Sequence, residues 1–271
     1  MKQSGTPLVT VMIPYYNCGK YIAETLESVD SQHYPNLEIV VVDDGSNTTE
    51  ATQLDNILKN YPHIHLIRQD NKGLSAARNA ASRIAKGSYY LFLDADDLIL
   101  PDYISECVAV LEGRPDCKLV YPQTEFFDAQ TGLWKLPPYK NLKKLLEGNH
   151  IPAIALHRAE DFHRLGGFDE NLKSHEDWDL WIRMLEYGGE AHQIDRILFR
   201  YRRRQDQSSL SNHLINQTEA VKASWQDVYI KHGCLFNKHG LGYYDLIHDL
   251  RKQSKQSLLK KLINCLKGKQ N

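Results

Sequence analysis

The chain has 271 residues, 42% hydrophobic and 25% charged, a globular composition that predicts one large domain or a domain with a small appendage. Its net charge of -1 excludes a general nucleic-acid binder, because no overall positive field is available to attract a phosphate backbone. The five cysteines are scattered, with neither CxxC nor Cys/His metal spacing, which is typical of reduced thiols. Because we find neither a signal peptide nor an apolar stretch of roughly 20 residues, we expect a cytoplasmic protein.

Short apolar segments alternate with helical patterns through the first hundred residues. Strands are predicted at Leu8–Pro14, Leu37–Val42, Ile64–Ile67 and Tyr89–Leu93, and helices at Tyr21–Val29, Leu54–Leu58 and Leu74–Ala85. The most apolar of these strands show no polar alternation, which is typical of a parallel sheet covered by helices on both faces. Ligands of such sheets bind beyond the carboxyl ends of the strands.

The second half of the chain is more mixed. Helices are predicted at Pro101–Leu111, Leu142–Leu146 and Asp177–Glu186, and strands at Lys118–Pro122 and Ile197–Tyr201. An aromatic, loop-rich stretch follows Pro122 and extends to Tyr139, and an apolar run covers Ile151–Leu156. From Ser211 onward the pattern is mostly helical. We therefore expect one domain over residues 1–210 and a helical extension over residues 211–271.

Three carboxylates follow the fourth predicted strand within a single turn, in the run Leu91-Phe92-Leu93-Asp94-Ala95-Asp96-Asp97. Their mutual repulsion is costly unless a cation or a hydrogen-bonded ligand shares the site. Asp94 and Asp96 alternate, which suits a divalent ion that takes oxygen ligands and carries substrate phosphates. The alternative is that Asp96 and Asp97 complement the dipole of the helix entered at Pro101.

Two further polar clusters lie near the ends of the second and third strands. In Asp43-Asp44-Gly45-Ser46, Asp43 could accept hydrogen bonds from a base edge or a ribose hydroxyl, or the segment could be a turn in which Ser46 caps the next helix. From Asn71 to Asn79, a helix opens with free N–H groups that favour an anion. Arg78 lies about one turn into that helix and could reach a phosphate or a base, or could simply be solvated.

The last cluster is Ser174-His175-Glu176-Asp177-Trp178-Asp179. Asp177 could act as a general base that takes a proton from an incoming hydroxyl. Alternatively, Glu176 and Asp177 compensate the dipole of the helix that they begin. We interpret His175 as a local hydrogen-bonding residue rather than a metal ligand. The chain shows no GxGxxG after its first strand, no P-loop and no GxSxG elbow.

These clusters, in this order, resemble the family-2 glycosyltransferases, inverting enzymes of the GT-A fold. The resemblance covers roughly residues 7 to 205. It is carried by Val11-Met12-Ile13-Pro14-Tyr15-Tyr16-Asn17, Asp43-Asp44-Gly45-Ser46, Gly73-Leu74-Ser75-Ala76-Ala77-Arg78-Asn79, Leu93-Asp94-Ala95-Asp96-Asp97, Gly167-Phe168-Asp169-Glu170 and Glu176-Asp177-Trp178-Asp179-Leu180-Trp181-Ile182-Arg183.

The resemblance implies an α/β fold with a mainly parallel central sheet flanked by helices, and a nucleotide-sugar donor, most often a UDP-sugar. The acceptor would be the hydroxyl of a saccharide or lipid-linked saccharide, as in polysaccharide biosynthesis. The implied roles are nucleotide binding for Pro14, Tyr16, Asp43, Asn71, Arg78 and Asp94, a Mn²⁺ or Mg²⁺ ligand for Asp96, a general base for Asp177, and a donor or acceptor contact for Glu176.

Two other functions compete with this one. A sugar-nucleotide pyrophosphorylase would need a Gly-rich basic loop after the first strand, and the segment Ile13–Asn17 is not one. A nucleotide-sugar-binding module without turnover would need no base such as Asp177. One departure from the family pattern is the segment Tyr201–Gln205, which lacks a usual His, although Arg204 could supply positive charge to phosphate.

The end of the chain is basic, with no acidic residue after Asp249. Apolar residues at helical spacing alternate there with lysines: Leu258, Leu259, Leu262, Ile263 and Leu266. This pattern predicts a helix in peripheral contact with anionic membrane, at the cytoplasmic face of the inner membrane and near a lipid-linked acceptor. The alternative is a helix that packs its apolar stripe on the main domain.

Overall fold

The computed structural model describes residues 5–205, 218–248 and 250–252. Within them, the centre of the fold is a nine-stranded mixed sheet in the order β3-β2-β1-β4-β8-β6-β9-β5, with β7 paired to β6. The strands are β1 (Val9–Tyr15), β2 (Leu37–Asp44), β3 (His65–Gln69), β4 (Tyr89–Phe92), β5 (Leu98–Ile99), β6 (Cys117–Asp128), β7 (Gly132–Trp134), β8 (Leu156–Arg158) and β9 (Glu190–Arg203).

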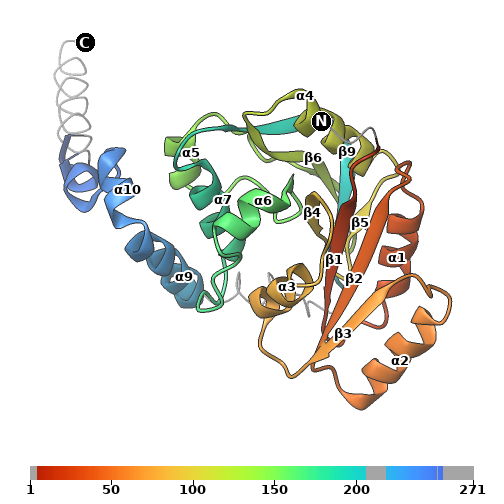
Figure 1. Ribbon diagram of the computed structural model, residues 1–271. Helices are drawn as coiled ribbons and strands as arrows, with labels where there is room; N and C mark the ends of the chain where they lie inside the picture. The colour runs from red at the N-terminus through yellow and green to blue at the C-terminus, as the bar shows by residue number, and fades with distance from the viewer. Residues whose placement is uncertain (1–4, 206–217, 249, 253–271) are drawn as a thin grey trace, which may run out of the picture.

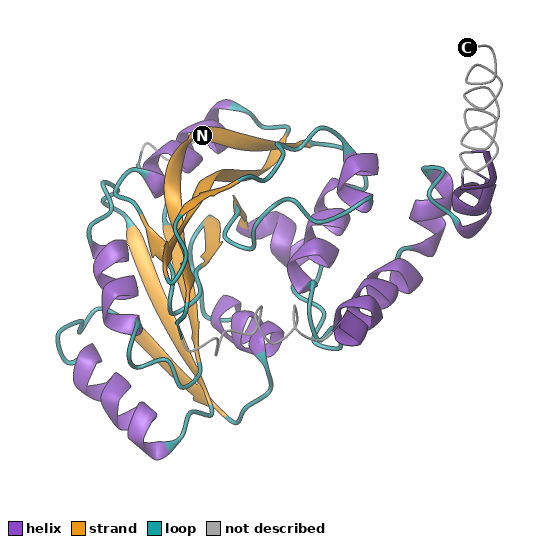
Figure 2. Cartoon of the chain, turned by 180° about the vertical axis from the view of Figure 1, so that it is seen from behind, coloured by secondary structure: helices purple, strands orange, loops and turns teal. Residues whose placement is uncertain are grey.

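The first four strands pair with one another in parallel, as the sequence predicts. These strands are buried on both faces, because every residue from Ile39 to Asp44 in β2, and every residue of β4, is nearly inaccessible to solvent. A strand that is apolar on both faces needs a helical layer on each side. Helices α1 and α2 cover one face of this half of the sheet, and α3 covers the other (Figures 1 and 2).

The helices of the described chain are α1 (Ile22–Asp30), α2 (Thr48–Leu58), α3 (Leu74–Ser82), α4 (Tyr103–Gly113), α5 (Leu142–Leu146), α6 (Ala159–Arg164), α7 (Glu176–Leu185), α9 (Thr218–Lys231) and α10 (Gly233–Lys238). The helices predicted before residue 205 are present, although the one expected at Leu54–Leu58 already begins at Thr48. Helix α7 is the most deeply packed in the second half of the chain, because Trp178 and Trp181 on it are both fully buried.

The second half of the sheet departs from the sequence prediction in three places. The predicted strand at Lys118 continues to Asp128 and is followed by β7, where a loop-rich stretch is expected. Strand β9 is far longer than Ile197–Tyr201. Both strands mix buried and partly exposed side chains without a regular period, and they pair with each other over most of their lengths.

The sheet is mixed rather than purely parallel because of β8 and β5. Strand β8 runs antiparallel to β4 and β6, and β5 runs antiparallel to β9. Most of the apolar run Ile151–Leu156 is irregular, and β8 begins only at its last residue.

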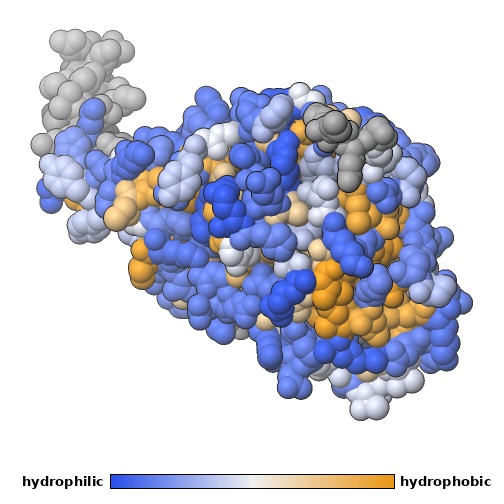
Figure 3. Space-filling model, viewed as in Figure 1, coloured by the Kyte–Doolittle hydropathy of each residue, from blue (hydrophilic) through white to orange (hydrophobic). Residues whose placement is uncertain are grey.

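The face drawn in Figure 3 is mostly hydrophilic, with apolar patches over the strands of the first half of the sheet. No helix in the described part of the chain is long and apolar enough to cross a membrane. The basic stretch from Leu258 to Leu266, for which membrane contact is predicted, and the expected boundary between residues 210 and 211 lie outside the described residues.

Candidate active site

A cavity of about 840 Å³ lies at the carboxyl ends of β1, β2 and β4, with the first turn of α7 on its opposite side. It brings together eight of the nine residues for which the sequence predicts a site role: Pro14, Tyr16, Asn71, Arg78, Asp94, Asp96, Glu176 and Asp177. Residues far apart in the chain therefore meet at the sheet edge where ligands of α/β folds bind.

Asp43 is the predicted site residue that lies outside this cavity lining. Its carboxylate is 3% exposed, accepts the backbone N–H of Ser46 at 3.0 Å and lies 3.5 Å from Nε of Arg68. Because successive side chains of a strand point to opposite faces, it is the neighbouring Asp44 that reaches the cavity wall.

Asp44 holds the loop that opens helix α3. Its carboxylate accepts the backbone N–H groups of Lys72 at 2.9 Å and Gly73 at 2.8 Å. Gly45 follows at φ +73°, and a Cβ there would lie 2.5 Å from the backbone nitrogen of Asn71. Glycine is therefore required for β2 to approach this loop so closely.

The cap of helix α2 differs from the predicted alternative. Asn47, not Ser46, accepts the backbone N–H of Glu50, at 3.1 Å. The Ser46 hydroxyl instead accepts the backbone N–H of Asn17 at 3.0 Å. This contact ties the turn after β2 to the turn after β1, on which Tyr16 lies at the cavity.

Arg78 is 1% exposed, so the alternative of a solvated arginine is wrong. Its guanidinium donates to Glu176 Oε1 at 2.6 Å and to Asp94 Oδ1 at 2.8 Å, and it lies 5.3 Å from the ring centre of Phe168. Burial opposes ionisation, but Asp94 and Glu176 outweigh it and raise the pKa of Arg78. One buried cation thus joins the strand-end carboxylates to the start of α7.

Asp96 faces a second arginine. Its Oδ2 accepts Arg204 Nε at 2.6 Å, and Arg204 also lies 3.2 Å from the Cys18 sulfur. Burial raises the pKa of Asp96, Arg204 opposes that shift, and the nearby Asp94 adds to it. Arg204 therefore belongs to the cavity, although its position after an unclear strand end left it outside the predicted site.

Asp97 is a structural residue. Its Oδ1 accepts the backbone N–H of Arg202 at 2.8 Å, and its burial raises its pKa, as do Asp96 and Asp94. Strand β5 separates this turn from helix α4, which begins at Tyr103. The alternative in which Asp96 and Asp97 serve the dipole of that helix is wrong, because both carboxylates contact the end of β9 instead.

Asp177 faces the cavity from the first turn of α7. Its Oδ2 accepts the side-chain N–H of Asn149 at 2.9 Å, and its Oδ1 accepts the backbone N–H of Trp178 at 2.7 Å. Burial, and then the charge of Glu176, raise the pKa of Asp177 to about 7, although Trp178, Arg78 and Asn149 act against the rise. A carboxyl group with that pKa can accept a proton near neutral pH.

No sequence signal identifies Asn149 as a partner of Asp177, because it lies in an irregular segment and becomes its neighbour only through the fold. His175 bears out the prediction of a local hydrogen-bonding role. It has a left-handed backbone at φ 59°, and its Nδ1 lies 3.0 Å from the Ser174 hydroxyl and in contact with Ser224 Oγ.

A metal ion would find oxygen ligands at one wall of this cavity. Among the described residues, no group of three or more His, Cys, Asp and Glu side chains is arranged to hold a metal by itself. Asp94 and Asp96 nevertheless both line the cavity, and Mg²⁺-type ions commonly bind through one or two carboxylates together with substrate phosphates. This donor set fits such an ion.

The mixed sheet, the strand-end carboxylates and the helix opposite them define the GT-A fold of nucleotide-sugar transferases. Residues 10–166, more than half of the chain, match the family described as "Glycosyl transferase family 2". The chain belongs to this family.

The relatives of the chain include polysaccharide synthases. It is 32% identical over 199 residues to the chondroitin synthase of Escherichia coli, covering 71% of this chain and 28% of that protein. It is 25% identical over 245 residues to the hyaluronan synthase of Pasteurella multocida, covering 88% of this chain and 24% of that protein. The chain therefore spans about a quarter of the length of these two relatives.

Two solved structures share the fold. TarS 1–349 of S. aureus in complex with UDP-GlcNAc superposes with a TM-score of 0.64 at 23% identity, covering 73% of this chain and 59% of that one. The mannosyltransferase PcManGT of Pyrobaculum calidifontis, in complex with GDP-Man and Mn²⁺, gives a TM-score of 0.59 at 19% identity, covering 97% of this chain and 81% of that one.

Proposed function

We propose that this chain is an inverting glycosyltransferase that moves a sugar from a nucleotide-sugar donor, a UDP-sugar, to the hydroxyl of a saccharide or lipid-linked saccharide. The observation that carries the proposal is a single cavity with Asp94 and Asp96 at one wall and Asp177 at the other. Binding alone would need no group with a pKa of about 7 at this position.

The donor would occupy the half of the cavity built by the first four strands. Pro14, Tyr16, Asn71 and Arg78 would surround the nucleoside, and Asp94 would face the ribose. The proposed role of Asp43 in reading the base requires its contact with Ser46 or Arg68 to open when the nucleotide binds. The complexes of TarS with UDP-GlcNAc and of PcManGT with GDP-Man support a nucleotide-sugar as the ligand class.

The fold family also implies a divalent metal, Mn²⁺ or Mg²⁺, which Asp96 would hold with Asp94 beside it. When bound, such an ion stabilises the charge on a departing diphosphate. The chain adds its own positive charge at this wall, because Arg204 contacts Asp96. Glu176 is held by Arg78, and from there it would contact donor or acceptor.

Asp177 would take the proton of the acceptor hydroxyl. An in-line attack from the face opposite the leaving group inverts the anomeric centre, and holding both substrates in line removes much of the entropic barrier. Asn149 would orient the carboxylate through its 2.9 Å hydrogen bond.

Donor binding is the first test of the proposal. With Mn²⁺ present, a nucleotide-sugar at 100 times its Kd should stabilise the folded chain by about 2.7 kcal/mol, seen as a rise in Tm in a screen that includes UDP-GlcNAc and GDP-Man. Release of the nucleoside diphosphate during turnover would separate a transferase from a pyrophosphorylase, which instead exchanges pyrophosphate. A screen in which no nucleotide-sugar raises Tm would contradict the proposal.

Asp96→Asn should weaken donor binding in Mn²⁺ by at least about tenfold, because the amide is a poor ligand for a hard cation. Calorimetry of donor binding with and without Mn²⁺ measures the effect, which should be small without the ion. Asp102→Asn, at an exposed carboxylate outside the cavity, is the matched control. Equal affinity of Asp96→Asn and the unsubstituted chain in Mn²⁺ would remove Asp96 from the metal site.

The pH dependence of turnover follows from the raised pKa of Asp177. The base must be ionised to accept a proton, so kcat/KM should fall as pH drops below about 7, by about tenfold per pH unit. An Asp with an ordinary pKa would keep its activity down to about pH 4. A profile that stays flat between pH 7 and 5 would show that the rate-controlling base is another group.

A further inference from the structure

Helix α9 lies against α7, the helix that begins with Glu176 and Asp177 (Figure 1). It belongs to the C-terminal extension and lies beyond the family match, which ends at residue 166. None of its residues lines the cavity. Its contacts with α7 nevertheless fall on both sides of Asp177 in the sequence.

The first contact lies immediately before the catalytic turn. The Ser224 hydroxyl bonds to the Ser174 hydroxyl and contacts His175 Nδ1, and it lies 3.3 Å from the carbonyl oxygen of Ser174. Next to it, the rings of Trp225 and Trp178 are 4.7 Å apart. His175 has a left-handed backbone, which persists only where the surroundings hold it.

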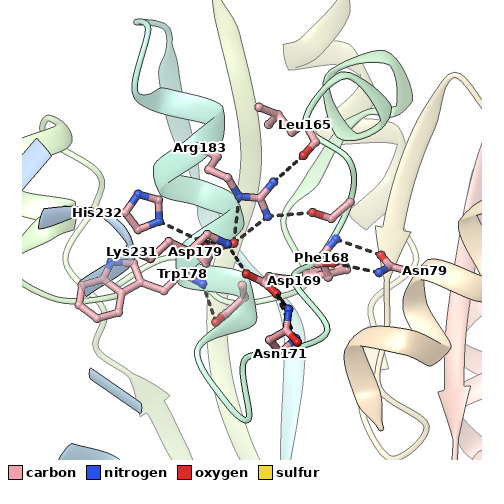
Figure 4. A network of polar contacts seen from close by, with 12 residues as sticks. Asn79, Leu165, Phe168, Asp169, Asn171, Trp178, Asp179, Arg183, Lys231 and His232 are labelled. Carbon is pink, nitrogen blue, oxygen red and sulfur yellow. Dashed lines mark hydrogen bonds and ion pairs between the residues drawn. The ribbon is translucent and has the colours of Figure 1, made fainter. Parts of the chain in front are cut away.

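The second contact lies one residue beyond Trp178. Asp179 is fully buried, and its Oδ1 accepts His232 Nε2 at 2.8 Å and Lys231 Nζ at 2.9 Å. Its Oδ2 accepts Arg183 Nε at 2.9 Å and Nη2 at 2.7 Å. Figure 4 shows Asp179 at the centre of this network, with Lys231 also reaching Asp169.

These partners keep Asp179 ionised. Burial alone would raise its pKa, but the hydrogen bond from His232 and the charges of Arg183 and Lys231 hold it well below its usual range. Removing one partner of such a buried cluster is costly, because the remaining charge loses compensation in a place that water does not reach.

We propose that α9 and the adjoining His232 form a positioning clamp that fixes the first turn of α7, so that Asp177 faces the reacting hydroxyl. The N-cap residue of α7, His175, makes no side-chain cap hydrogen bond. The first turn of a helix has unpaired N–H groups and frays unless it is held. Ser224 holds this turn from one side of Asp177, and His232 with Lys231 holds it from the other. The inference rests on the proposed role of Asp177.

The test uses the full chain with His232→Ala and Ser224→Ala, and Lys222→Ala as the control. Lys222 is on the same helix, 62% exposed, and pairs with Glu219 of that helix. Hydrogen–deuterium exchange of peptides spanning Ser174–Leu185 should become about tenfold faster in both clamp variants, since each loses at least one buried hydrogen bond, and should not change in the control. His232→Gln should restore slow exchange, because its amide can donate to Asp179.

The second measurement is turnover and donor affinity. With UDP-GlcNAc or GDP-Man in Mn²⁺, kcat for donor hydrolysis should fall by about 10–100-fold in His232→Ala while the donor Kd stays within about twofold. If the role were merely structural, kcat and donor affinity would either both fall or both stay unchanged. His232→Gln should recover most of the lost kcat.

Two results would overturn the clamp: exchange equal to that of Lys222→Ala, or faster exchange with unchanged kcat. The Ser224→Ala variant removes a single hydroxyl and serves as the deciding variant if His232→Ala fails to fold. If the unsubstituted chain hydrolyses neither donor, the proposed function loses support. The exchange experiment then decides on its own whether α9 holds the start of α7.

Discussion

Replacing Asp177 by Asn should lower kcat by about 10²–10⁴, the contribution typical of a positioned general base. Asn has nearly the same shape and keeps a hydrogen bond to Asn149, but it cannot take a proton. Donor binding, measured by calorimetry, should survive because the nucleoside side of the cavity is untouched. Turnover of the nucleotide-sugar is the measurement that decides.

Stability separates loss of the base from loss of the fold. At pH 8 the Asp177 carboxylate is ionised although burial disfavours its charge, so the neutral amide should leave Tm unchanged or slightly higher. Glu186→Gln, at the other end of the same helix, is the matched control and should retain normal kcat. Near-normal turnover by Asp177→Asn would refute the assignment of the base.

Arg78→Met should lower the free energy of unfolding by about 3 kcal/mol, the lower end of the range for a broken buried ion pair because Asp94 is partly exposed. Met fills a similar volume, but it leaves Glu176 and Asp94 without the cation that lies between them. Urea unfolding followed by circular dichroism measures the loss. Donor affinity should fall as well, since Arg78 also lines the cavity.

Arg83→Met is the control for this change, because Arg83 follows the same helix and is exposed. It should alter stability by no more than about 0.5 kcal/mol. Adding Glu176→Gln to Arg78→Met should recover part of the loss, because the two residues are coupled through a 2.6 Å contact. Equal stability of the Arg78→Met variant and the control would mean that the pair contributes little.

The first half of the fold could be predicted because its strands are buried on both faces. Runs such as Leu37–Val42 leave no alternative to a covered parallel strand, and the structure pairs them as expected. The second half is harder to predict because β6 and β9 mix polar and apolar side chains without a regular period. Their stability comes from pairing with each other over most of their lengths, and a local pattern cannot show such a partner.

The residues of the site likewise divide into those that the sequence predicts and those that it does not. Asp94, Asp96 and Arg78 follow recognisable strand ends, so their gathering at one cavity could be predicted. Arg204 could be named only as a candidate outside the predicted site, because it follows a strand whose end is unclear in the sequence. Asn149 could not be predicted, because it lies in an irregular segment. Both reach the site only through tertiary packing, one against Asp96 and the other against Asp177.

The contacts of α9 with the start of α7 could not be predicted from the sequence either. Its apolar and polar residues predict only a helix, and nothing in the local pattern joins Ser224 or His232 to the start of α7 some fifty residues earlier. In the sequence, Asp179 is typical of an ordinary first-turn acid. Only the fold shows that two of its partners, Lys231 and His232, come from the C-terminal extension.

The most direct test of single displacement is the configuration of the first product. Proton NMR during hydrolysis of an α-linked UDP-sugar in Mn²⁺, before mutarotation, reports which anomer the enzyme releases. A water activated by Asp177 from the face opposite the leaving group gives the β-anomer. Initial release of the α-anomer would contradict the account, because the attacking group would then have approached from the other face.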